Sequence, residues 1–238
     1  MLTWWELGSS FWQLFYLSCR IVLYRKIVFM GGGIVIYFGG HYLFAVFWPG
    51  EGFSMEQALR VLVEIPGTVL GIYLTMDMIA GERDKDTLEI LFSTSTNHFT
   101  IWSIRLVAVC VLLLFSLLGM SLSAYFLFAE FPYFLGGLNA FVSAFVLVGV
   151  TFLFSVLCQG GNAAGMLSLG VLIMAIITGE NFPNTPYFLF LNPFEAPLSF
   201  DETIWLEKVW INRLGYMSIS VLCLFLSMRR MENRERIL

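Results

Sequence analysis

Charged residues are scarce in this sequence. Asp, Glu, Lys and Arg make up 13% of its 238 residues, while apolar residues make up 58%. An average soluble domain carries about 25% charged residues. The composition therefore excludes an ordinary soluble domain and indicates a chain that lies in a lipid bilayer.

The sequence also lacks the motifs of common catalytic and nucleotide-binding sites. It contains no Gly-x-x-x-x-Gly-Lys-[Ser/Thr] loop for ATP phosphates and no Gly-x-Ser-x-Gly nucleophile motif. The two histidines, His41 and His98, show no spacing to carboxylates that suggests a metal site. We therefore expect a chain that is not an enzyme, with no catalytic residue, no metal site and no cofactor of its own.

Cysteines and basic clusters are few as well. The 4 cysteines are widely spaced and form neither a metal-binding pattern nor a disulfide framework. Basic residues form no face or run outside the last ten residues. Nucleic acid is therefore not an expected partner.

Long uncharged runs predict six membrane-spanning helices. A helix rises about 1.5 Å per residue, so about 20 residues cross a hydrocarbon core of about 30 Å. The uncharged run from Phe131 to Gly179 would form a helix about 74 Å long, so it must fold back, at Gln159–Asn162. We predict an all-α membrane protein whose residues 27–238 form one domain, with spans at residues 27–48, 55–79, 101–128, 138–157, 163–178 and 209–228.

Residues 1–26 precede the first span. Positive charges follow the apolar part of this segment and no small-residue cleavage site occurs, so it is not a signal peptide. Its apolar side chains fall mostly on one helical face, which predicts an interfacial amphipathic helix along the membrane surface. A frayed apolar terminus is the alternative.

The distribution of basic residues orients the spans. An even number of spans puts both termini on one side. Cytoplasmic termini place every basic residue except Arg60, Lys208 and Arg213 in the cytoplasm. Because this bias follows the positive-inside rule, we expect both termini on the cytoplasmic side of the plasma membrane, in bacteria the inner membrane.

Glycines are concentrated in the first span, at Gly31–Gly33 and Gly39–Gly40. Glycines would weaken a soluble helix, but in a membrane they let a neighbouring backbone approach closely. We therefore expect another helix to pack against them. His41, in the same span, is either a hydrogen-bonded packing residue, or a ligand or proton carrier.

The second span is the least apolar. Arg60 and Glu64 lie one α-helical turn apart and are expected to pair. Charged side chains at membrane depth face the protein interior or water. The polar residues of this span recur at helical spacing and so form a stripe along one side of the helix. This stripe is part of a substrate path or purely structural, and its candidate residues are Arg60, Glu64, Thr68 and Thr75.

Residues 180–208 interrupt the apolar pattern. Four prolines between Pro183 and Pro197 exclude a regular spanning helix, but the aromatic content is too high for a free loop. Such a segment suits a re-entrant or interfacial cap that packs on protein. It is either an outer gate of the substrate path, with Asn192 and Pro193 as candidate residues, or a structural lid.

The densest charge cluster lies between the second and third spans. Six of the eight residues 82–89 are charged, so this segment must lie in water. Residues 86–89, Asp-Thr-Leu-Glu, have the form of a capping box, which predicts a short helix beginning at Thr87. A plain solvated loop is the alternative. In the helical reading, an apolar edge suited to docking is formed by Leu88, Leu91 and Phe92.

Residues 82–94 resemble the Glu-Arg-x-x-Gly-Thr-Leu-Glu-x-Leu-Leu-x-Thr-Pro signature of ABC-2 type transporter permeases. Two positions depart from it, because Asp86 replaces the usual Gly and Ser95 replaces the usual Pro. In that family the segment includes a coupling helix that contacts the ATPase subunit. The resemblance implies that the ATPase-coupling residues are Glu82, Arg83, Asp84, Lys85, Asp86, Thr87, Leu88, Glu89, Leu91 and Phe92.

The same resemblance implies the fold of a type V ABC exporter. Its parts are an N-terminal interfacial helix, six spans, the cytoplasmic coupling helix, and an outer re-entrant pair of short helices between spans five and six. It implies a membrane subunit that works with a second permease copy, identical or related, and with two separate ATPase chains that bind ATP and Mg²⁺. An amphipathic or hydrophobic cargo, such as a peptide, lipid or drug, fits the apolar and aromatic composition. The alternatives are an ATP-independent six-span transporter or channel, and an ABC-coupled membrane sensor or scaffold.

A cysteine placed at Thr94 tests the orientation. In a chain whose native cysteines are replaced by alanine, we expect Thr94→Cys to react with a membrane-impermeant maleimide only once the cytoplasmic side is opened. Labelling at this position in intact cells would place the segment outside and contradict the coupling assignment.

Overall fold

The computed structural model describes residues 26, 28–47, 54–80, 98–182, 185, 187–194, 196–197 and 201–232. All regular structure in this part of the chain is helical. It contains six helices long and apolar enough to cross a membrane, as predicted. They are Val28–Phe47; a continuous helix made of α2 (Met55–Gln57), η1 (Ala58–Glu64) and α3 (Ile65–Thr75); α6 (His98–Leu127); α7 (Tyr133–Leu157); α8 (Gly161–Asn181); and α9 (Glu202–Glu232).

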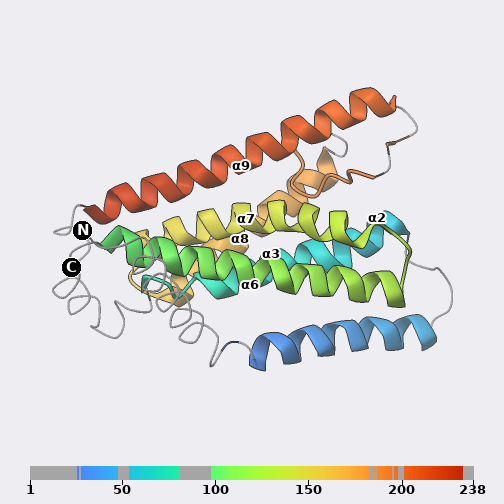
Figure 1. The fold of residues 1–238 in the computed structure, drawn as a ribbon, viewed down its shortest axis with the longest axis horizontal. Helices are drawn as coiled ribbons and strands as arrows, with labels where there is room; N and C mark the ends of the chain where they lie inside the picture. Colours follow the sequence, from blue (N-terminus) through green and yellow to red (C-terminus); the bar gives the residue numbers. More distant parts are fainter. Residues whose placement is uncertain are drawn as a thin grey trace, which may run out of the picture.

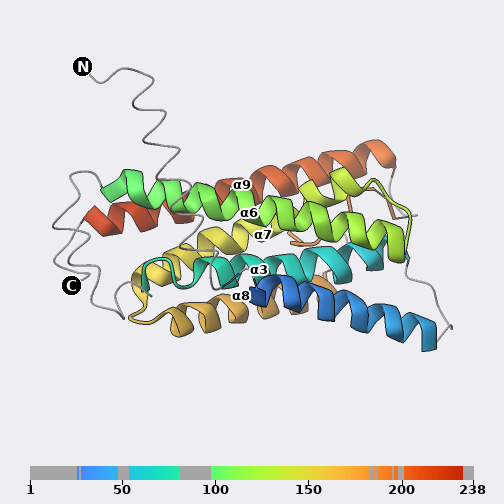
Figure 2. The same cartoon turned by 60° about the horizontal axis from the view of Figure 1, so that its bottom comes forward.

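Successive long helices run in alternating directions along one bundle (Figures 1 and 2). One end of the bundle holds the end of α9 and the start of α6 at its tip, and on the same side, farther in, the first helix begins and α3 ends; this side is here called the Lys26 end. The opposite end, here called the Ser54 end, holds the starts of α2, α7 and α9. The expected interfacial helix at residues 1–26 and the expected coupling helix lie outside the described residues, except for Lys26.

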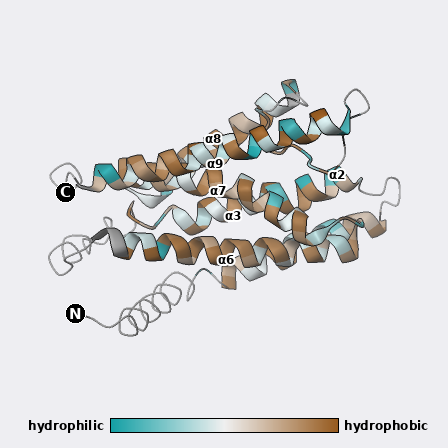
Figure 3. Cartoon of the chain, turned by 45° about the horizontal axis from the view of Figure 1, so that its top comes forward, coloured by the Kyte–Doolittle hydropathy of each residue, from teal (hydrophilic) through white to brown (hydrophobic). Residues whose placement is uncertain are grey.

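Several helix boundaries differ from those expected. The fourth long helix begins at Tyr133 rather than at 138, and the sixth begins at Glu202 rather than at 209. Hydropathy marks only the apolar middle of a spanning helix, whereas α9 continues into polar residues at both ends, as Figure 3 shows. The second helix ends at Thr75 rather than at 79, because Met76–Ile79 form turns.

The second helix begins as its sequence predicts. The Ser54 hydroxyl accepts a bond from the Gln57 amide, and the Gln57 side chain accepts one from the Ser54 amide, both at 3.2 Å. This capping box satisfies amides that the first helical turn leaves free. The helix then widens into the seven-residue π-helix η1 before it continues as α3. Pro66 follows directly inside this continuous helix, where it has no amide to donate to a carbonyl of the preceding turn.

Helix α7 occupies the centre of the bundle and contacts η1, α3, α6, α8 and α9. Small residues on α7 allow these close approaches. A Cβ atom added to Gly137 would lie 3.3 Å from the Leu118 Cα of α6, and one added to Gly149 would lie 3.2 Å from the Ser220 Cα of α9. Glycine is therefore required where the backbones of neighbouring helices nearly meet α7.

The first helix packs differently from the other five. Within the most apolar 18-residue stretch of this helix, only 6% of the residues are buried. A Cβ added to Gly31, Gly32, Gly33, Gly39 or Gly40 would meet nothing within 4 Å. The expectation that these glycines admit a close neighbouring backbone is therefore wrong within the described chain. Contact with the bundle instead comes from larger side chains such as Phe38, whose ring lies 6.3 Å from that of Phe128.

The segment between α8 and α9 contains no helix among its described residues. The pair of short helices that the resemblance implies is therefore not found in residues 182, 185, 187–194, 196–197 and 201. Residues Phe188–Asn192 are buried and are called the strap below. Irregular backbone of this kind is tolerated at membrane depth where it packs on protein.

Gly149→Ala tests the contact between α7 and α9. We expect it to lower the melting temperature by an amount equivalent to about 1–3 kcal/mol, because a methyl group would force these helices apart. Gly215→Ala on α9 is the matched control, since nothing lies within 4 Å of its added Cβ. Equal melting temperatures for the two variants in the same detergent would contradict this account of the packing.

Candidate functional site

A cluster of buried polar side chains lies toward the Ser54 end of the bundle, among apolar neighbours. Its members come from η1, α7 and α9 and surround the strap. Glu64 is 1% exposed, Ser143 is 0% exposed and Arg213 is 8% exposed. Polar groups this deeply buried persist only when they satisfy one another.

Arg213 fastens the strap to α9. Its guanidinium donates to the Leu191 carbonyl at 2.7 Å, to the Leu189 carbonyl at 3.2 Å and to the Ser143 hydroxyl at 3.4 Å. The Ser143 hydroxyl in turn donates to the Leu189 carbonyl at 3.1 Å. These carbonyls lie outside any helix, so they need side-chain donors where water is excluded.

Glu64 joins the same cluster from η1. The Asn139 amide donates to its Oε1 atom at 2.6 Å, and the charge of Arg213 acts on it as well. A buried carboxylate and a buried guanidinium are tolerated together because each offsets the other's charge. Hydrogen bonds therefore join η1 to α7 at Glu64 and join α7, α9 and the strap at Arg213, and the charges of Glu64 and Arg213 act on each other between these two parts.

Arg60 does not pair with Glu64 as the sequence predicts. Among the described residues these two side chains form no ion pair. The Arg60 guanidinium instead lies 5.0 Å from the centre of the Phe188 ring in the strap. The reason is η1, in which the amide of Ile65 bonds to the carbonyl of Arg60, five residues earlier. In this wider turn, residues four apart no longer stack as they do in an α-helix.

The other candidates of the substrate path separate into two groups. Thr68 and Thr75 are buried and donate to carbonyls of their own helix, at Ile65 and Gly71, so they do not join the cluster. Asn192 ends the strap, where its side-chain oxygen accepts from the Phe194 amide and its carbonyl accepts from the Trp205 indole. Pro193 follows it and is half-buried. In this conformation the cluster therefore connects the surrounding elements by close packing.

Sequence reasoning missed Asn139, Ser143 and Arg213 as site residues. Arg213 carried the clearest signal, because it is a cation inside the expected sixth span and must face the protein interior. Asn139 and Ser143 carried a weaker one, as polar residues one helical turn apart at the start of an apolar run. The sequence does not show that the packing of α9 brings Arg213 close to Asn139 and Ser143.

The turns that follow α3 are fastened at the Lys26 end. The buried Ser155 hydroxyl of α7 accepts from the amides of Ile79 and Ala80 at 3.1 and 3.0 Å, and it donates to the Met76 carbonyl. On the other side, the Lys26 ammonium lies 3.0 Å from an oxygen of Asp77. The chain therefore enters residues 81–97, where the coupling residues Glu82–Phe92 were expected, from a fixed point. Those residues lie outside the described part of the chain.

Comparison with known proteins adds no relative. No family model matches this chain, and no curated protein matches it. Among the described residues, no group of three or more His, Cys, Asp and Glu side chains could hold a metal ion. The proposed function therefore depends on the sequence and on two features of the structure, the buried cluster and the fixed turns after α3.

Arg213→Met tests the buried cluster. We expect it to lower the free energy of unfolding by about 3–5 kcal/mol, because it removes the stronger of the two positive charges that act on Glu64 and leaves the Leu191 carbonyl without its donor. The double variant Glu64→Gln with Arg213→Met should lose less than the sum of the two single changes. Arg230→Met, on the exposed part of α9, is the control. Additive losses in denaturant titrations would show that the two groups are not coupled.

Proposed function

We propose that this chain is the membrane subunit of an ATP-driven exporter similar to ABC-2 permeases. The observation that carries the proposal is the signature-like segment at residues 82–94, located between the second and third of six apolar helices. In this proposal the chain supplies the membrane pathway, while a separate ATPase binds ATP and Mg²⁺. Two permease chains and two ATPase chains form the working unit.

The arrangement of helix ends supports this function. α3 ends and α6 begins at the Lys26 end, so residues 81–97 connect two helices at the end where the first helix begins and α9 ends. The positive-inside rule assigns this end to the cytoplasm, where ATP is available. A docking element there is in reach of a cytoplasmic ATPase.

A mechanical connection from this segment into the bundle supports coupling. Ser155 ties the residues before the segment to α7, and α7 contacts every helix from η1 to α9. A displacement of the docking segment would therefore be transmitted to the central helix as well as to α3. Rigid elements joined in this way can carry a coupling free energy between two distant sites.

The buried cluster supplies a candidate gate at the Ser54 end. In the proposed mechanism, the strap closes this end while Arg213 holds the carbonyls of Leu189 and Leu191. Opening toward the outside would require α9 and α7 to part and those bonds to break. The energy of ATP binding is the proposed source for this step.

One observation favours a second candidate function, an ATP-independent transporter. Glu64 and Arg213 are ionisable groups buried at membrane depth, and such groups often mark ion or proton pathways. A reconstituted chain that moves ions or solutes with no ATPase subunit present would favour this candidate. Transport that requires ATP and the partner chain would favour the exporter.

Replacing Leu88 and Leu91 by Asp tests the exporter function. We expect the double variant to insert in the membrane normally but to lose copurification with a coexpressed ABC ATPase subunit by at least about tenfold, because two apolar anchors are removed. Ile90→Asp is the control, since helical spacing puts Ile90 off the edge formed by Leu88 and Leu91. If the double variant and the control copurify equally well, the docking assignment is wrong.

A further inference from the structure

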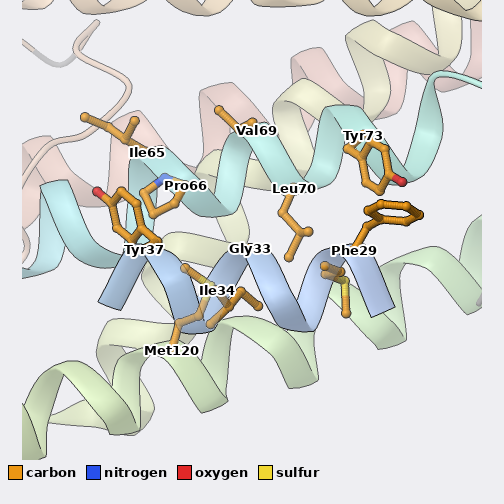
Figure 4. A pocket seen from close by; sticks show the side chains of 11 residues that line it. Phe29, Gly33, Ile34, Tyr37, Ile65, Pro66, Val69, Leu70, Tyr73 and Met120 are labelled. Carbon is orange, nitrogen blue, oxygen red and sulfur yellow. The ribbon is translucent and has the colours of Figure 1, made fainter. Parts of the chain in front are cut away.

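A cavity of about 530 Å³ separates the first helix from the bundle. Figure 4 shows it between the Val28–Phe47 helix and α3, with α6 closing one side through Met120. Phe29 and Tyr73 face each other at one end, and Tyr37 lies beside Ile65 and Pro66 at the other. Its volume falls within the usual range of ligand pockets, about 300–1,000 Å³.

The walls of this cavity are suited to an apolar occupant. Leu70 and Met120 contribute aliphatic surface, and Gly33 leaves open space in the wall formed by the first helix. The Tyr37 hydroxyl is occupied, since it donates to the Val61 carbonyl of η1 at 2.7 Å. A polar ligand would lose its hydration here without gaining hydrogen bonds in return.

The surroundings of the first helix indicate the source of that occupant. The helix is long and apolar enough to cross a membrane, and only 6% of its most apolar stretch is buried in the bundle. The medium around it in a bilayer is therefore lipid hydrocarbon. Leaving the cavity empty would forfeit the dispersion contacts of its walls, and lipid chains are the molecules at hand to restore them.

A cation lies beside Tyr73, which lines one end of the cavity. The Lys26 ammonium lies 4.8 Å from the centre of the Tyr73 ring and donates to the Tyr73 carbonyl at 2.8 Å. It also pairs with Asp77, so two of its three donors are used and one is left for a phosphate oxygen. Phosphate is the anionic group that all phospholipids share.

We propose that this cavity binds one acyl chain of a membrane phospholipid whose phosphate lies at Lys26. The site holds the first helix against α3 and α6 through the lipid chain, in place of direct contacts between helix backbones. This inference is independent of the exporter function, because lipid binding here needs neither nucleotide nor an ATPase subunit.

Photolabelling of the full chain tests the site without any variant. The protein is reconstituted in phosphatidylcholine vesicles that contain a phosphatidylcholine with a diazirine near the middle of one acyl chain, because Ile34 and Leu70 lie between the two ends of the cavity. We expect labelling of Ile34 and Leu70 to exceed labelling of Val35 by at least about fivefold, because a lodged chain stays beside the cavity walls. Val35 is 71% exposed and Leu70 only 9% exposed, so a freely diffusing lipid would label Val35 more and overturn the proposal.

A matched pair of glycine variants tests the cavity itself. Gly33→Phe fills the cavity, and we expect it to lower labelling of Leu70 by at least about fivefold. Gly32→Phe is the control, because Gly32 does not line the cavity and an added Cβ there also meets nothing. Unchanged labelling in Gly33→Phe, or an equal loss in both variants, would overturn the proposal.

The position of the diazirine tests the orientation. A group next to the ester linkage should label Phe29 and Tyr73, near Lys26, and a group at the chain end should label Tyr37. The reverse pattern would overturn the placement of the phosphate at Lys26.

Discussion

The carbonyl groups of Leu189 and Leu191 belong to a buried stretch that forms no helix, and the Arg213 side chain donates to both. Where water is absent, an unpaired backbone carbonyl costs several kcal/mol, so irregular backbone can exist only beside such a donor. Arg213 needs a counter-charge in turn, which Glu64 supplies from η1 with the support of Asn139. The positions of the strap, η1 and α9 around α7 therefore depend on one another.

Helix α7 connects these elements to the rest of the bundle. At the Ser54 end it contributes Asn139 and Ser143 to the buried cluster, and at the Lys26 end it contributes Ser155, which holds the turns after α3. Between these ends, glycines bring it within backbone distance of α6 and α9. Both ends of the molecule are thus tied to one central helix, which is the physical basis of the coupling proposed above.

The sequence was sufficient for the helices and insufficient for their contacts. The six spans and the Ser54 capping box follow from hydropathy and from local hydrogen-bond chemistry, both of which act over a few residues. The predicted Arg60–Glu64 pair failed because periodicity assumes an α-helix, whereas residues 58–64 form a π-helix. In the sequence Arg213 is only a basic residue near the outer side, since its partners range from Leu191, 22 residues away, to Glu64 on the second helix, and only packing brings them together. The coupling assignment stays a prediction, as it falls on residues outside the described part.

The π-helix has a geometric consequence of its own. Its turn is wider than that of an α-helix, so two side chains four positions apart point in different directions. Arg60 thereby reaches the aromatic face of Phe188, while Glu64 reaches the amide of Asn139. A single turn of backbone thus contacts two separate neighbours, Phe188 of the strap and Asn139 of α7. If that turn tightened by one residue, the Arg60 and Glu64 side chains would point toward the same side of the helix. At least one of the two contacts would then be lost.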